Sequence, residues 1–125
     1  MTGALLVFAG GGLGAVLRYG VNRLAFHLAG PGFPWSTIVV NVLGSLLMGL
    51  LIGALAAAPG GVSHHMRQFL ATGLLGGFTT FSAFSLDALT LWERGQAGAA
   101  CAYVLGSVVL SLLAVAAGFF LSRAL

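Results

Sequence analysis

Neutral polar side chains recur at helical spacing along a chain that carries very few charges. Tyr103, Ser107 and Ser111 are spaced four residues apart and therefore share one face of a helix. Asn41 lies in another apolar segment, where its amide is costly to bury without a hydrogen-bond partner. A pathway for cations or protons usually displays acids within the membrane. A line of hydroxyl and amide donors is instead suited to a small anion.

A second polar group lies in the segment GGFTTFSAF, residues 76–84. Glycine and threonine are poor residues for an uninterrupted helix, so Gly76 and Gly77 are expected to let a helix break here. A break frees backbone carbonyls that a cation could use as ligands. Phe81 and Phe84, three residues apart, could present their electropositive ring edges to an anion.

These side chains need elements that hold them at depth in a membrane. Hydrophobic residues make up 59% of the 125 positions and charged residues only 6%, whereas a soluble domain is about a quarter charged. Four apolar segments, residues 2–28, 35–58, 68–86 and 95–122, are long enough to cross a bilayer. The sequence therefore predicts an all-α integral membrane protein, with residues 1–125 forming a single four-helix transmembrane domain whose third helix is broken near its middle.

Several classes of function find no support in the residue content. The five arginines are scattered and there is no lysine, so no basic stripe for nucleic acid exists. The single cysteine, Cys101, excludes an internal disulfide and a multi-cysteine metal site. Serines in the spans have no histidine nearby, so the chain is not expected to be an enzyme.

The distribution of arginine gives no preferred orientation in the membrane. Four spans place Arg67 and Arg123 on one side and Arg94 with Arg23 on the other, two against two. Because orientation follows an imbalance of Lys and Arg between sides, neither orientation is favoured. Two interpretations remain open at this point: a weak signal in a short chain, or insertion in both orientations with pairing as an antiparallel dimer.

Small residues mark the faces on which helices are expected to approach one another. Gly10 and Gly14 lie four apart in the first span, and Ser45, Gly49 and Gly53 continue the face of Asn41 in the second. Such faces let helix backbones touch in lipid. Four short spans enclose little space, which also favours an oligomer.

Three segments together resemble the signature of a known family. They are GGGLGAVLRYG at 10–20, TIVVNVLGSLLMG at 37–49 and GLLGGFTTFSAFSLD at 73–87. In this order they resemble the CrcB/Fluc fluoride channel family, and the resemblance extends over nearly the whole chain. It implies a multi-pass protein of the cell membrane that forms an antiparallel, dual-topology homodimer with two fluoride pores and a central structural sodium ion.

The resemblance also implies roles for individual residues. The carbonyls of Gly76 and Thr79 from both subunits would hold the sodium ion. The residues implied for the fluoride pore are Asn41, Thr80, Phe81, Ser82, Phe84, Tyr103, Ser107 and Ser111. Arg18 would attract anions electrostatically or form a structural pair, with Asp87 as a candidate partner.

The expected function is passive, fluoride-selective efflux that lowers cytoplasmic fluoride. The alternative is a small dual-topology, proton-coupled multidrug antiporter, which has a similar length and number of spans. Such an antiporter needs a membrane-embedded acid, and the first span, residues 2–28, has none. A purely structural protein would explain the glycine faces, but it would explain neither the aligned donors nor the broken helix.

Overall fold

The computed structural model describes residues 1–58, 60–61 and 63–125, and the described residues form helices and short links without a strand. The helices are α1 (Thr2–Ala29), α2 (Trp35–Ala57), α3 (His64–Arg67), η1 (Gln68–Leu75), α4 (Gly76–Phe78), α5 (Phe81–Glu93) and α6 (Ala97–Ala124). Four segments are long and apolar enough to cross a membrane: α1, α2, α6 and the stretch His64–Glu93. The predicted all-helical, four-span fold is confirmed, while residues 59 and 62 of the predicted 58–67 link lie outside the described part.

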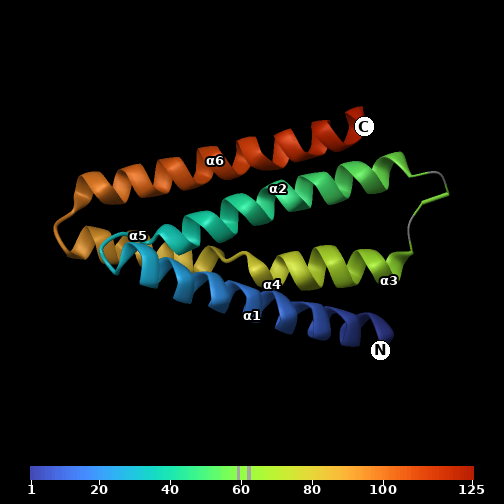
Figure 1. Ribbon diagram of the computed structural model, residues 1–125, viewed down its shortest axis with the longest axis horizontal. Helices are drawn as coiled ribbons and strands as arrows, with labels where there is room; N and C mark the ends of the chain where they lie inside the picture. The colour runs from blue at the N-terminus through green and yellow to red at the C-terminus, as the bar shows by residue number, and fades with distance from the viewer. Residues whose placement is uncertain (59, 62) are drawn as a thin grey trace.

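The four spans form two closely packed pairs (Figure 1). Helix α2 packs along α6, and α1 packs along η1 and α4. Both chain termini and the link that precedes α3 lie at one end of the bundle, while the links at 30–34 and 94–96 lie at the other. This arrangement puts Arg67 and Arg123 at the first end and Arg94 at the second.

Glycine makes both close pairings possible. A Cβ atom on Gly14 of α1 would lie only 2.7 Å from the Phe78 nitrogen and would also collide with the Leu74 carbonyl oxygen. Gly49 of α2 meets Val115 and Phe119 of α6 in the same way. In lipid, such contact between backbones replaces the exclusion of water as the force that holds helices together.

Gly14→Ala is expected to destabilise the protein by about 1–3 kcal/mol, because the added methyl group forces α1 away from the third span. Gly12→Ala is the matched control: it lies on the same helix, and its Cβ would meet nothing within 4 Å. Thermal unfolding in detergent measures both variants. Equal melting temperatures for the two would contradict this packing.

The third span is the irregular one. Residues Gln68–Leu75 form a π-helix, a rare conformation that is frequent at functional sites. The expected break at Gly76 and Gly77 is wrong in position, since both glycines are helical within α4. The chain leaves the helix at Thr79 and Thr80, whose backbones are extended. Gly77 instead provides close contact, because a Cβ there would collide with Gly11 of α1.

Candidate ion pathway

The side chain of Asn41 holds the break in the third span. Its Nδ2 donates to the carbonyl oxygen of Thr80 at 3.0 Å, and its Oδ1 accepts from the backbone nitrogen of Thr80 at 2.8 Å. One amide therefore satisfies both backbone groups of a residue that has left the helical pattern. The half-buried amide of Asn41, predicted to need a partner, finds it in the irregular backbone.

Threonine hydroxyls stabilise the two helix ends at the break. Thr79 Oγ1 donates to the Leu75 carbonyl at 3.0 Å and so caps the preceding helix. Thr80 Oγ1 accepts from the Ala83 nitrogen at 3.1 Å, as expected of a threonine at the N-cap of α5. Ser82 is exposed and lies 3.3 Å from the Thr80 hydroxyl.

The break leaves particular carbonyl groups free. The nitrogens of Thr80 and Ala83, which would bond Gly76 and Thr79 in a continuous helix, bond Asn41 and Thr80 side chains instead. Within the described residues, no hydrogen bond reaches the carbonyl oxygens of Gly76 and Thr79. These are the two carbonyls that the resemblance implies for sodium.

Arg18 lies against the same break. Its Nε donates to the Gly77 carbonyl at 3.2 Å, where it faces the negative end of the half-helix that stops at Phe78. The suggested pairing of Arg18 with Asp87 is not found among the described residues. Asp87 instead accepts hydrogen bonds from two hydroxyl groups.

A cavity of about 350 Å³ lies between α2, α5 and α6 beside the break. It brings together six of the eight residues predicted for the pore: Asn41, Thr80, Phe81, Phe84, Ser107 and Ser111. The other two, Ser82 and Tyr103, are not among its lining residues. The remaining lining residues are Gly44, Ser45, Met48, Thr79, Val108, Leu112 and Val115.

Ser107 leaves an unused hydroxyl group in this cavity. The residue is 4% exposed, and its Oγ has no hydrogen-bond partner among the described residues. A buried hydroxyl without a partner costs about 1–3 kcal/mol, so natural proteins seldom leave one. A donor in this position is available to whatever occupies the cavity.

The phenylalanine rings form one wall of the cavity. The centroids of Phe81 and Phe84 lie 5.4 Å apart, and Phe84 lies 5.3 Å from the ring of Tyr103. Phe84 is buried, whereas Phe81 is 77% exposed in the single chain. The exposed ring of Phe81 is available to lipid or to a second protein chain.

Tyr103 belongs to a hydrogen-bonded group that sequence reasoning missed. Its hydroxyl donates to Asp87 Oδ2 at 2.9 Å, and Thr37 Oγ1 donates to the same oxygen at 2.6 Å. Thr37 and Tyr103 are both buried. The spacing could have revealed Thr37, since it lies four residues before Asn41 on the same helix face.

These features define a class of protein: a helical membrane protein with a cavity of neutral donors and aromatic rings beside a broken helix. The model of the family described as CrcB-like protein, Camphor Resistance (CrcB), matches residues 5–119. The chain belongs to the CrcB family.

Relatives match over nearly the full length. A protein of Paracoccus denitrificans called "Fluoride-specific ion channel FluC" is 60% identical, covering 97% of this chain and 94% of that protein. A protein of Rhodopseudomonas palustris with the same name is 54% identical and covers 97% of both chains. Another of that name, from Rhizobium meliloti, is 54% identical over 100% of this chain and 99% of its own length.

Proposed function

We propose that this chain forms a fluoride-selective channel in the plasma membrane, through which cytoplasmic fluoride leaves passively. The observation that carries the proposal is the unpartnered Ser107 hydroxyl, buried in a cavity whose wall includes the Phe84 ring. A small anion can accept a hydrogen bond from the hydroxyl and contact the positive edge of the ring. The full-length relatives named as fluoride-specific channels support the same ion.

Selectivity follows from the chemistry of the lining. Fluoride is small and strongly hydrated, so a pore that conducts it must supply several close donors in place of water while keeping binding weak enough for release. The cavity supplies such donors as hydroxyl and amide groups, including Asn41, Ser107 and Ser111. No side chain that lines it carries a charge, so fluoride is not held there by a fixed cation.

The passive mode is tested by the voltage at which current reverses. A channel across a fluoride gradient reverses at the fluoride equilibrium potential, whatever the pH difference between the two sides. A proton-coupled antiporter, the alternative function, would move its cargo in response to a pH gradient. Purified protein in a planar bilayer provides the measurement, and a reversal potential that follows pH would contradict the channel.

The active unit is proposed to be an antiparallel homodimer with two pores. The cavity is bordered by Phe81, which is 77% exposed in the single chain and would be covered by a partner. The balanced arginines support insertion in both orientations, which supplies the two antiparallel partners. A small intramembrane surface gains affinity from such symmetric pairing because each contact is made twice.

Adding positive charge at one end of the bundle is expected to fix the orientation and to depress fluoride flux. The double variant His64→Lys, His65→Lys adds two charges beside Arg67 at exposed positions. One orientation then predominates and antiparallel partners become scarce. The accessibility of a C-terminal tag from each side of the membrane measures orientation.

The control for this experiment is His64→Gln, His65→Gln, which changes the same positions without adding charge. It should keep the tag accessible from both sides and should retain flux. A tag found on a single side in the unmodified, active protein would contradict dual topology.

The dimer is further proposed to hold a structural sodium ion at its centre. The free carbonyl oxygens of Gly76 and Thr79 fit this role, because two copies of the chain supply four uncharged oxygen atoms and such ligands suit a hard cation. When bound, the ion offsets the carbonyl dipoles that face one another. Arg18 and Asn41 occupy the neighbouring backbone groups and leave these carbonyls available.

Removing sodium is expected to lower the melting temperature of the dimer, because an ion that binds only the folded state stabilises it. Sodium at about 100 times its dissociation constant contributes about 2.7 kcal/mol. The measurement is thermal unfolding in detergent as sodium is replaced by N-methylglucamine at constant anion concentration. A dimer that stays equally stable and conductive with no sodium present would overturn the proposal.

A further inference from the structure

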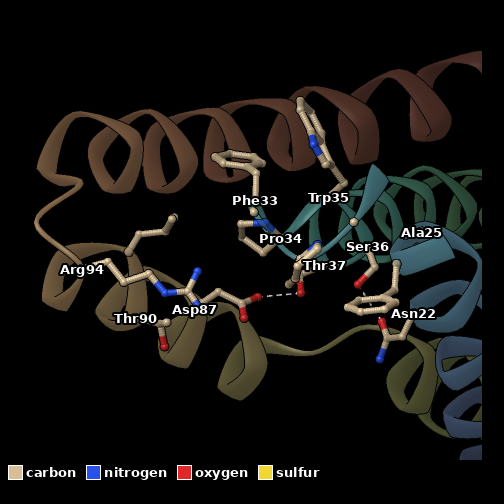
Figure 2. Close-up of a pocket in the computed structure, with 15 residues that line it drawn as sticks. Asn22, Ala25, Phe33, Pro34, Trp35, Ser36, Thr37, Asp87, Thr90 and Arg94 are labelled. Carbon is tan, nitrogen blue, oxygen red and sulfur yellow. Dashed lines mark hydrogen bonds between the residues drawn. The ribbon is translucent and has the colours of Figure 1, made fainter. Parts of the chain in front are cut away.

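A second cavity, of about 320 Å³, lies at the end of the bundle that holds the 30–34 link (Figure 2). Its walls come from the end of α1, that link, the start of α2 and the last turns of α5. Asp87 and Thr90 line it from α5, Arg94 lines it from the position just after that helix, and Thr37 lines it from α2. Unlike the first cavity, it contains charged side chains.

One layer of side chains separates the two cavities. Thr37 and Asp87, which line the second cavity, share the 2.6 Å hydrogen bond drawn in Figure 2. Tyr103 donates to the same Asp87 oxygen, and its ring contacts Phe84, which lines the first cavity. A direct route between the two cavities would therefore run past the Asp87 carboxylate.

Arg94 carries the only positive charge among the side chains that line the second cavity. In Figure 2 its side chain extends along the cavity toward Asp87. Within the described part of the chain, its guanidinium takes part in no hydrogen bond or ion pair. With Arg94 the two charges of the lining cancel, and without it the lining would carry one uncompensated negative charge that repels an anion.

We propose that this second cavity is an outer anion site at one mouth of the pathway, and that Arg94 is the residue that admits a small hydrated anion past Asp87. The proposal rests on the proposed fluoride conduction. A cation in a cleft with low-dielectric walls raises the local concentration of anions, and this effect weakens as salt is added. An arginine that only anchored the end of α5 at the membrane surface would have no such effect on flux.

The test is fluoride efflux from liposomes of zwitterionic lipid, with sodium and fluoride held constant while an impermeant salt sets the ionic strength. Three variants are compared with the unmodified protein: Arg94→Gln, Arg94→Lys and Arg23→Gln. Arg23 is the matched control, since it lies at the same end of the bundle and bonds Tyr19 outside the cavity. Losing Arg23 removes one arginine from that side of the membrane, as losing Arg94 does, so the two variants change the arginine balance equally.

Arg94→Gln is expected to lower flux about tenfold at an ionic strength of about 10 mM, where the screening length is about 30 Å. At about 1 M, where that length is about 3 Å, the deficit should shrink to less than about twofold. Arg94→Lys should restore most of the flux. Because a barrier at one mouth slows an ion moving in either direction, both pores of an antiparallel dimer are affected alike.

Two failures are distinguishable. If the unmodified protein conducts no fluoride, the proposed function fails. If it conducts, but Arg94→Gln and Arg23→Gln respond alike to ionic strength, only the outer anion site is overturned. A loss of flux in Arg94→Gln that persists at about 1 M salt and is not restored by lysine would also overturn it, because such a loss reflects packing and not charge.

Discussion

Replacing Phe84 with isoleucine is expected to reduce fluoride flux by about 30-fold while the protein stays folded. The ring is buried between Phe81 and Tyr103, with centroid separations of 5.4 and 5.3 Å. A desolvated cation on the face of a ring gains about 2 kcal/mol from the ring quadrupole, and a contact of the same size between the anion and the ring edge corresponds to about 30-fold in rate. Isoleucine keeps the apolar character and most of the bulk, but it lacks the positive ring edge.

Phe81→Ile is expected to act in the same way, and methionine at either position should be less damaging because its chain is flexible and polarizable. The matched control is Phe119→Ile. Phe119 packs against Phe120 in α6 and does not line the cavity. Volume-conserving apolar substitutions usually cost less than about 1.5 kcal/mol of stability, so all three isoleucine variants should fold.

The comparison separates a pore role from packing. If the rings only pack, the Phe81 and Phe84 variants conduct like the Phe119 control and differ from the unmodified protein only in stability. Such a result would place the anion route elsewhere. Flux per folded dimer in liposomes, together with the melting temperature in detergent, provides both readouts.

Asn41→Ala is expected to abolish measurable fluoride flux and to lower stability as well. The truncation leaves both the nitrogen and the carbonyl oxygen of Thr80 without the amide that they bond at 2.8 and 3.0 Å. A fully buried polar group without a partner costs about 1–3 kcal/mol, so the two half-buried groups of Thr80 together cost at most about 6 kcal/mol. Phe81 and Phe84 follow Thr80 directly, so the rings should lose their positions together with the break.

The stability readout decides between two roles for Asn41. If the amide only lined the pore, Asn41→Ala would reduce fluoride flux and leave the melting temperature unchanged. If the amide holds the break, Asn41→Ala lowers both the flux and the melting temperature. Gln96→Ala serves as the control, since it removes an amide from an exposed position in the link before α6. Unchanged melting in Asn41→Ala would rule out the structural role.

Much of the architecture could be predicted because it depends on local pattern. The four spans follow from runs of apolar residues, and the faces of Gly10, Gly14, Gly49 and Gly53 follow from helical spacing. The line of Ser107 and Ser111 could be found in the same way, and both residues line the cavity between α2, α5 and α6. Such features need only the period of a helix.

The position of the break could not be predicted by the same reasoning. Gly76 and Gly77 lower helix propensity, but propensity is a weak guide when a distant side chain can bond the backbone. Asn41, 39 residues before Thr80, moves the break to Thr79 and Thr80 by supplying both hydrogen bonds. Gly77 is used for close contact with α1, which no local pattern distinguishes from a break.

The hydrogen bonds of Asp87 also could not be predicted from the sequence. The sequence suggests Arg18 as a partner for Asp87, yet the Asp87 Oδ2 accepts hydrogen bonds from Thr37 and Tyr103. These two hydroxyls come from α2 and α6, which approach Asp87 only in the folded bundle. Long-range pairings of this kind depend on how the spans pack, and the order of residues does not reveal it.

Fluoride-selective conduction is tested by efflux of fluoride and chloride from liposomes that contain the purified, unmodified protein. Each anion is loaded in turn as its potassium salt, and an ion-selective electrode follows its release. A potassium ionophore lets potassium leave with the anion, so that no membrane potential builds up and stops the efflux. Fluoride is expected to leave rapidly, and chloride no faster than from protein-free liposomes. Equal release of both anions, or no release of fluoride beyond that of protein-free liposomes, would contradict it.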